Sequence, residues 1–287
     1  MTLEKTTEIL IVGLGVIGGG YATALTKAGY TVRCITKNQS DVDFAMERGM
    51  ILEGRTEVSA EMLGRADVVI CALYPTVFIE WIGENQHLLK SGAVLTDVTG
   101  VKGAVVDRVQ SILRPDVEFI AAHPMAGRER SGVEYSDPEV FKGANYIVTP
   151  TDKNTEEAIE LCKKLGEILG FGKISVLSAD EHDRMIAFLS QLTHVIAVTL
   201  MNCNTGEGLE KYTGDSFRDL TRIAKINDLM WSELFLLNKD ALLSEIDAFS
   251  RELSEFREML INEDSEGMRE KMRLSTARRA LFDKPKG

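Results

Sequence analysis

The stretch ILIVGLGVIGGG, residues 9–20, decides the fold of this chain. Four apolar residues lead into the glycine pattern G-x-G-x-x-G, and an alanine-containing segment that continues to Ala28 is typical of a helix. A strand, a glycine turn and a helix in this order are typical of dinucleotide-binding folds, in which the backbone closely approaches a pyrophosphate at the helix N-terminus. A glycine turn without a ligand is the alternative. The predicted cofactor-binding residues of this stretch are Gly13, Gly15, Val16, Ile17 and Gly18.

The second predicted strand, residues 31–35, ends without an acidic residue. In folds of this type an Asp or Glu at this place hydrogen-bonds the ribose 2′-hydroxyl of NAD. Here Thr36, Lys37 and Ser40 offer two hydroxyls and a cation, which suit a 2′-phosphate, and no carboxylate in residues 36–40 repels one. The sequence therefore favours NADP as the cofactor, with NAD possible. A solvated turn that contacts no phosphate is the alternative.

Strands continue to alternate with helices up to about residue 178. Residues 66–73 form a near-continuous apolar run of the kind that parallel sheets bury on both faces, and Leu73 at its end is assigned to the cofactor site. Further strands are predicted at residues 93–98, 117–122, 146–149 and 174–177, and an amphipathic helix at residues 156–169. This alternation predicts an α/β fold with a doubly wound parallel sheet of the Rossmann type, spanning residues 1–178.

The composition of the chain changes after Ser178, because no further strand pattern follows. Helices are predicted at residues 180–201, 218–226, 228–260 and 266–282, the third with heptad-like apolar spacing. An all-α domain of residues 179–287 this rich in apolar positions predicts a dimerisation domain and hence a homodimer. A helical cap on a monomer is the alternative.

The stretch AAHPMAGRERSG, residues 121–132, directly follows the predicted strand 117–122. It places His123 at the carboxyl end of that strand, where open α/β sheets bind their ligands. This position suits a catalytic base, whereas a loop histidine that only ends the strand is the alternative.

Three motifs carry a resemblance to the prephenate and arogenate dehydrogenases. The HPMAG sequence with the glutamate and Ser-Gly that follow it resembles their signature, FRDLTRIA (residues 217–224) is similar to their Phe-Arg-Asp-x-Thr-Arg-Ile-Ala, and SQLTH (residues 190–194) resembles their Ser-His-x-x-His. The similarity covers roughly residues 8–240. It implies NADP-dependent oxidative decarboxylation of prephenate to 4-hydroxyphenylpyruvate in tyrosine biosynthesis, and the alternative is conversion of arogenate to tyrosine.

The resemblance also implies roles for individual residues. His123 is the expected base, and Thr99 is expected to supply the hydroxyl that a family serine usually provides at the position of Gly100. His194 and Gln191 are expected to contact the substrate, the latter in place of the first family histidine. Arg222 matches the arginine that clamps the ring carboxylate. The remaining expected substrate contacts are Arg218, Glu129 and Arg130, and no metal is expected.

Two other kinds of protein share this outline. β-Hydroxyacid dehydrogenases also join a Rossmann half to a helical half, but they rely on a lysine in the interdomain helix, and residues 182–210 contain none. A nucleotide sensor of the same fold would leave His123, His194 and Arg222 unexplained as a set. An enzyme of aromatic amino acid biosynthesis is therefore favoured over both.

The overall charge restricts the partners. With 33 Lys and Arg against 44 Asp and Glu, the formal net charge is −11, which argues against nucleic acid or an anionic membrane as a partner. An anionic small-molecule substrate must therefore meet a local group of cations. The sequence shows no signal segment, its apolar runs have strand length, and its four cysteines form no CxxC pair, so a cytoplasmic location is expected.

Overall fold

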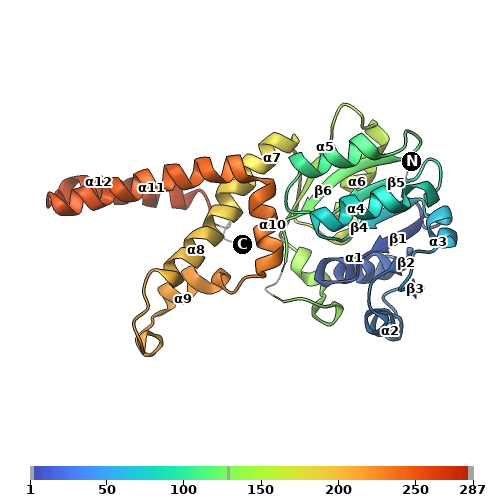
Figure 1. Cartoon of the computed structure of the whole chain (residues 1–287), viewed down its shortest axis with the longest axis horizontal. Coiled ribbons are helices and arrows are strands. Elements are labelled where there is room, and N and C mark those ends of the chain that lie inside the picture. Colours follow the sequence, from blue (N-terminus) through green and yellow to red (C-terminus); the bar gives the residue numbers. More distant parts are fainter. Residues whose placement is uncertain (1–2, 128–129, 284–287) are drawn as a thin grey trace. The chain divides into compact units, whose positions relative to one another are not determined.

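The computed structural model describes residues 3–127 and 130–283. The chain folds into two compact units, Met1–Lys239 and Asp240–Gly287 (Figure 1). The first unit contains the sheet and its surrounding helices. The second contains almost all of α11 (Lys239–Ile261) together with α12 (Ser265–Ala280), joined by a tight turn.

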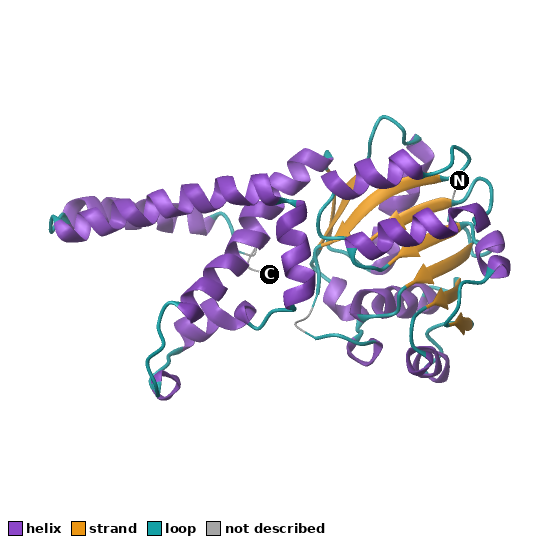
Figure 2. Ribbon diagram, in the orientation of Figure 1, coloured by secondary structure: helices purple, strands orange, loops and turns teal. Residues whose placement is uncertain are grey.

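One eight-stranded sheet forms the centre of the first unit (Figure 2). Its strand order is β3-β2-β1-β4-β5-β6-β7-β8. The strands are β1 (Glu8–Val12), β2 (Thr31–Ile35), β3 (Glu53–Arg55), β4 (Val68–Cys71), β5 (Val94–Asp97), β6 (Glu118–Pro124), β7 (Asn145–Thr149) and β8 (Lys173–Val176). The first six strands are parallel and follow the 3-2-1-4-5-6 order of a Rossmann sheet, which confirms the predicted fold class.

The last two strands run in the opposite direction, which the sequence did not predict. β7 pairs antiparallel with β6, placing Ile147 opposite His123, and β8 pairs parallel with β7. In its described part, the connection between β6 and β7 contains only the short turns η2 (Val133–Tyr135) and η3 (Pro138–Phe141). A parallel return needs a long crossover, usually a helix, so β7 starts at the edge where β6 ends.

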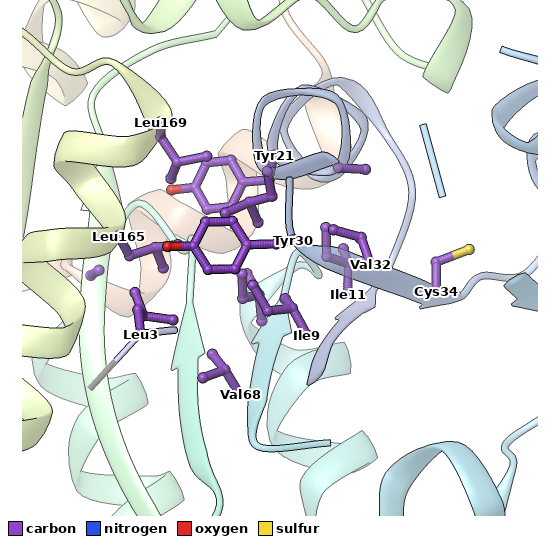
Figure 3. Packing of buried hydrophobic residues seen from close by; sticks show 14 of the residues in the cluster. Leu3, Ile9, Ile11, Tyr21, Tyr30, Val32, Cys34, Val68, Leu165 and Leu169 are labelled. Atoms are coloured by element: carbon purple, nitrogen blue, oxygen red, sulfur yellow. The ribbon is translucent and has the colours of Figure 1, made fainter. Parts of the chain in front are cut away.

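Helices cover both faces of the sheet because successive residues of a buried strand point to opposite sides. Ile9 and Ile11 of β1 pack with α1 and α6 on one face, whereas Leu10 and Val12 pack with α4 and α5 on the other. Figure 3 shows the first face, where Ile9 and Ile11 lie among side chains of α1 and α6. The helices of this region are α1 (Val16–Lys27), α2 (Gln39–Glu47), α3 (Ala60–Arg65), α4 (Pro75–Asn85), α5 (Gly103–Ile112) and α6 (Glu156–Leu169).

After β8 the chain is helical throughout its described length, as predicted. A capping box between Ser178 and Glu181 starts the first of these helices. The elements are α7 (Ala179–Ile186), the π-helical segment η4 (Ala187–Leu192), α8 (Thr193–Asn202), η5 (Leu209–Lys211), α9 (Asp215–Thr221), η6 (Arg222–Ala224) and α10 (Asp228–Leu237). The predicted helix 228–260 is interrupted at Asn238, because the buried side chain of Asn238 donates to the Asp183 carbonyl and to Gln191 Oε1, both at 2.8 Å.

One stretch of the described chain, Ala179–Asn202, is long and apolar enough by composition to cross a membrane. Length and composition alone are weak evidence, since core helices of folded domains share them. Within this stretch His182 and Gln191 are buried and make polar contacts with other elements of the first unit. These contacts tie the first half of the stretch to the rest of the first unit, although only 28% of the apolar window is buried.

Candidate functional site

The glycine turn after β1 lies where the strand order of the sheet reverses. β1 pairs with β2 on one side and β4 on the other, and open α/β sheets bind ligands at the carboxyl ends of such strands. Gly13 N donates to the Ile35 carbonyl at 2.8 Å, and Leu14 N donates to Thr36 Oγ1 at 3.3 Å. These bonds fix the turn against the end of β2.

Three glycines give this turn the shape that a dinucleotide requires. Gly13 has φ +93°, and a Cβ there would lie 2.4 Å from the Ala72 carbonyl oxygen and 2.9 Å from Leu73 Cδ2. A Cβ on Gly18 would lie 2.1 Å from the Gly13 carbonyl oxygen. By contrast, nothing lies within 4 Å of a Cβ on Gly15. Gly13 and Gly18 therefore permit internal close packing, whereas the Gly15 backbone faces open space that a pyrophosphate can approach.

The first turn of α1 is available to an anion. Val16 and Ile17 begin the helix, and its N-cap, Gly15, provides no side-chain capping bond. The first N–H groups of a helix have no intrahelical acceptor and carry the positive end of its dipole. The residues present thus fit a dinucleotide cofactor, with the pyrophosphate at this turn.

The residues predicted to hold a 2′-phosphate gather after β2. Thr36 is buried and bonded to the glycine turn, while Lys37 and Ser40 are exposed. Thr36 N also donates to the Arg55 carbonyl at 3.0 Å, so the end of β3 lies beside this loop. The exposed Arg55 guanidinium, which pairs with Glu53 at 2.8 Å, adds a cation that the sequence analysis did not select, because the three-residue strand β3 lacks an apolar pattern.

His123 lies next to last in β6, as predicted, and is half-buried. Its Nδ1 is 2.8 Å from Nε2 of the buried His182, whose Nδ1 is 2.7 Å from Asp183 Oδ1. Its other ring nitrogen faces the loop after β5, since a Cβ on Gly100 would lie 3.9 Å from His123 Nε2. The structure therefore joins β5, β6 and α7 at one histidine.

A buried ion pair supports the loop that follows β5. Lys102 and Asp97 have fully buried side chains, and Lys102 Nζ lies 2.7 Å from Asp97 Oδ2. The other oxygen of Asp97 accepts from Ala122 N at 3.0 Å, which ties β5 to the residue before His123. Thr99 is also buried, and its hydroxyl contacts Asp97, the Val101 carbonyl and Lys102 Nζ. The structure thus directs Thr99 Oγ1 into the ion pair, whereas Gly100 faces His123.

Burial sets the charge of both histidines. It lowers the pKa of His123 well below its ordinary value, and the electrostatic influence of His182 and Lys102 lowers it further. Burial likewise lowers the pKa of His182, although the hydrogen bond to Asp183 opposes this change. A lowered pKa means that both rings are neutral near pH 7, so His123 can accept a proton there.

Helix α10 lies against the carboxyl ends of the parallel strands (Figure 1). Glu233 Oε1 accepts from Thr76 N at 2.6 Å, and Asn227 Nδ2 donates to the Tyr74 hydroxyl at 3.2 Å, so α10 is bonded to the start of α4. Leu234 covers Gly100, because both of its methyl groups would lie 3.6 Å from a Cβ there. The helical region thereby closes over the loop that faces His123.

The same helix meets His194. The His194 ring stacks on Trp231 with ring centroids 3.6 Å apart, and its Nδ1 lies 2.8 Å from the Ser190 carbonyl. Trp231 is one turn from Leu234, so one face of α10 reaches both Gly100 and His194. Gln191 is buried, its Nε2 donates to the Leu234 carbonyl at 2.8 Å, and its Oε1 accepts from Asn238. The structure therefore places Gln191 in the packing of α10.

The predicted arginines lie at different places. Arg222 is exposed and begins η6, which packs against α8, the helix of His194. Arg218 donates to Thr213 Oγ1 at 2.9 Å and to Asp215 at 3.0 Å, and it lines a cavity of about 380 Å³ beside α8. Arg130 lies over the Tyr135 ring, 4.9 Å from its centroid, and Glu129 is outside the described residues.

Comparison with known families covers most of the chain. Residues 21–174 match the nucleotide-binding domain of prephenate dehydrogenase, and residues 178–274 match its dimerization domain. The chain belongs to the prephenate dehydrogenase family. It is thus an oxidoreductase of the prephenate/arogenate dehydrogenase type, with an NAD(P)-binding Rossmann domain and a helical dimerisation domain.

Individual relatives agree with this assignment. The chain is 32% identical over 274 residues to prephenate dehydrogenase of Bacillus subtilis, covering 92% of this chain and 73% of that protein. It is 30% identical over 291 residues to cyclohexadienyl dehydrogenase of Zymomonas mobilis, covering 98% and 97%. The crystal structure of Aquifex aeolicus prephenate dehydrogenase with hydroxyphenyl propionate and NAD⁺ superposes with a TM-score of 0.89 at 31% identity, covering 99% of this chain and all of that one.

This member of the prephenate dehydrogenase family departs from the expected motifs at two described positions. Gly100 stands where a serine is usual, and a serine side chain fits there, since its Cβ would make only ordinary contacts of 3.6–3.9 Å. Gln191 stands where the first histidine of Ser-His-x-x-His is usual, and here it holds α10.

The sequence of this family member does not reveal the partners of His123. His182 and Asp183 gave no signal of their own, since they belong to no recognised motif and lie 59 and 60 positions from His123. The antiparallel return of β7 and the start of α7 bring them to β6. Only the adjacent His-Asp pair at the start of an otherwise apolar helix could have drawn attention to them.

Proposed function

We propose that the chain catalyses the NADP-dependent oxidation and decarboxylation of prephenate to 4-hydroxyphenylpyruvate and CO2. The observation that supports this most is the position of His123, a neutral half-buried imidazole at the end of β6, with one ring nitrogen toward the loop after β5. A base at the carboxyl end of the sheet that carries the dinucleotide turn is what oxidation of a ring alcohol requires. The names of the relatives make prephenate the first candidate, and arogenate is the alternative.

The roles of the residues follow from the chemistry of a cyclohexadienol. A dinucleotide held at the glycine turn and the first turn of α1 would supply the acceptor for the hydride from the carbon that carries the hydroxyl. His123 Nε2 takes the hydroxyl proton as that carbon becomes a carbonyl, and such a base contributes about 10² to 10⁴ in rate. Loss of the ring carboxylate as CO2 then makes the ring aromatic, and the proton returns to the new phenol oxygen. The ion pair of Asp97 and Lys102, with Thr99, holds the loop that faces this reaction.

The substrate anions need cations from the helical region. Arg222 is proposed to hold the ring carboxylate, since a guanidinium presents a planar pair of donors that matches a carboxylate. His194 is proposed to contact the ring side of the substrate from its place on Trp231. Arg218 is proposed as a further substrate contact, and Arg130 and Glu129 are proposed to order the mouth of the substrate site.

The activity test combines the purified protein with each substrate and each cofactor. We expect the near-ultraviolet absorbance of the reduced nicotinamide to rise fastest with prephenate and NADP⁺. A faster rise with arogenate would reassign the substrate, and a faster rise with NAD⁺ would reassign the cofactor. Absence of reduction in all four mixtures would favour a nucleotide sensor.

Replacement of Arg222 by Ala is expected to raise KM for prephenate with a smaller change in kcat. The reason is that a charge-assisted hydrogen bond contributes about 1.5–3 kcal/mol, which corresponds to roughly 10- to 100-fold in binding. Steady-state kinetics would measure the change, with Arg184→Ala as control, since Arg184 is an exposed arginine of α7 paired with Asp180. An unchanged KM in the Arg222 variant would show that the carboxylate binds elsewhere.

Replacement of Lys37 by Asp is expected to reverse the cofactor preference. A carboxylate there would repel a 2′-phosphate and could accept a hydrogen bond from a ribose 2′-hydroxyl, so kcat/KM for NADP⁺ should fall roughly 10- to 100-fold relative to NAD⁺. The Arg55→Ala variant should weaken NADP⁺ in the same direction. Lys153→Asp, an exposed lysine before α6, serves as control. Equal ratios in the Lys37 variant and the parent would remove Lys37 from the phosphate site.

We further propose that the protein is a cytoplasmic homodimer, with a domain boundary close to residue 178. The family assignment of residues 178–274 supports a dimer. Exposed apolar side chains on the helices of this region also support it; they include Phe188, Leu189, Phe217, Leu220, Leu229 and Leu236. Sedimentation equilibrium should give twice the mass of the chain, and the mass of one chain would contradict a dimer.

A further inference from the structure

The contacts of Asp183 determine where the hydrogens of the two histidines lie. Asp183 Oδ1 accepts from Lys102 N at 2.8 Å, and Oδ2 accepts from Gly103 N at 2.7 Å, so both oxygens act as acceptors at the start of α5. The third contact, 2.7 Å from His182 Nδ1 to Oδ1, must then be donated by the histidine. The hydrogen of the neutral His182 ring is therefore on Nδ1.

The same reasoning extends to His123. With its hydrogen on Nδ1, a neutral His182 has only a lone pair on Nε2, and this atom lies 2.8 Å from His123 Nδ1. His123 must therefore donate from Nδ1, and its Nε2 is unprotonated. Nε2 is also the nitrogen that faces Gly100 and the ends of the parallel strands.

We propose that His182 and Asp183 are positioning residues that hold His123 in the tautomer with the hydrogen on Nδ1, leaving Nε2 as the base of the proposed oxidation. This inference rests on the proposed role of His123. The arrangement has the logic of a catalytic triad, in which a carboxylate fixes the histidine tautomer, but here a second imidazole stands between the carboxylate and the base. His123, His182 and Asp183 together are called the relay below. Asn238 supports the relay because its side chain donates to the backbone carbonyl of Asp183.

The charges around the relay are consistent with two neutral rings. Lys102, before α5, faces both histidines and lowers the pKa of each, while Asp97 of β5 and Asp183 of α7 act on His182 in the opposite direction. Burial is the largest influence on both rings, and it favours their neutral forms. When His123 takes up a substrate proton, its Nδ1–H can donate more strongly to His182, with the Asp183 carboxylate behind it.

Nitrogen NMR of the ring atoms tests the proposal without substrate. The chain has only four histidines, so two-bond proton–nitrogen correlations of labelled protein can be assigned with a His123→Asn variant. We expect a protonated Nδ1 and an unprotonated Nε2 at His123 in the parent protein. A hydrogen on Nε2 of His123 in the parent would overturn the proposal, whatever the substrate of the enzyme proves to be.

Kinetics of two His182 variants provide the second test. His182→Phe removes the acceptor, so the hydrogen of His123 should move to Nε2 and kcat should fall by about 10- to 1,000-fold. His182→Gln places an amide oxygen near the position of Nε2 and should recover most of kcat together with the parent tautomer. His87→Gln, at an exposed histidine, should leave both unchanged.

The outcomes separate positioning from simple structural support. Loss of activity in His182→Phe with the His123 tautomer unchanged, or equal loss in both His182 variants, would overturn the proposal. If His182→Phe fails to fold, the parent spectrum and the glutamine variant still decide. If the parent reduces no cofactor with prephenate or arogenate, the NMR result alone tests the tautomer, and the failure belongs to the proposed function.

Discussion

Substitution of His123 by Asn is expected to lower kcat by about 10²- to 10⁴-fold while cofactor affinity stays close to that of the parent. The loss is large because the base takes up the hydroxyl proton as the carbonyl forms, and an amide cannot accept that proton. The cofactor contacts are unaffected because the glycine turn after β1 and the start of α1 hold no part of His123. Asparagine also retains a donor close to the position of Nδ1, so the bond to His182 can persist.

The pH profile gives this prediction a second measurement. Because burial lowers the pKa of His123, the imidazole stays unprotonated as the pH falls to about 6.5, the ordinary value for histidine. Activity in kcat/KM should therefore stay level down to that pH and decline only below it. The pH profile of the asparagine variant should lack this decline at low pH. Turnover close to that of the parent, or an unchanged decline, would exclude His123 as the base.

The second large effect is expected from a matched pair of glycine substitutions. Gly18→Ala should destabilise the protein by about 1–3 kcal/mol and abolish tight cofactor binding, because its Cβ would lie 2.1 Å from a backbone oxygen and the turn must shift. Gly15→Ala should leave the melting temperature nearly unchanged, since nothing lies within 4 Å of its Cβ, yet it should weaken cofactor binding at least about tenfold by blocking the pyrophosphate.

Thermal unfolding with and without NADP⁺ would separate these two effects. Bound cofactor stabilises the folded state more the tighter it binds, so both variants should lose much of the shift in melting temperature that NADP⁺ causes in the parent. A Gly15 variant with full cofactor affinity would show that the pyrophosphate lies away from this turn. A Gly18 variant as stable as the parent would show that the close approach to Gly13 is relaxed in solution.

The sequence predicted the Rossmann half because its signals are local. The run before Gly13 and the apolar strand that ends near Leu73 each carry their own pattern, and the strands β1, β2, β4, β5 and β6 lie where these patterns place them. β3 was missed because Glu53-Gly-Arg55 is an edge strand whose pairing with β2 comes from tertiary structure. The reversal of β7 was missed because strand direction depends on the connection, which the apolar pattern does not encode.

The site could be predicted only where one short segment defines a position. His123 follows from its place at the end of a strand, and the glycine turn follows from its spacing. The inward direction of Thr99 and the engagement of Gln191 with α10 depend on side chains that lie far apart in the sequence. The same holds for His182, whose relation to His123 exists only once α7 packs against β6.

The π-helical segment η4 has a consequence for how this protein tolerates insertions and deletions. A π turn holds one residue more than an α turn, so removing a single residue from Ala187–Leu192 would let the backbone become regular α-helix without a break. Because the deletion would remove only the extra residue of the π turn, the side chains that follow would keep nearly their present direction, whereas a deletion from regular α-helix rotates them by about 100°. His182 would stay beside His123 and His194 would stay on Trp231, so a one-residue deletion within Ala187–Leu192 should be tolerated better than one elsewhere in Ala179–Asn202.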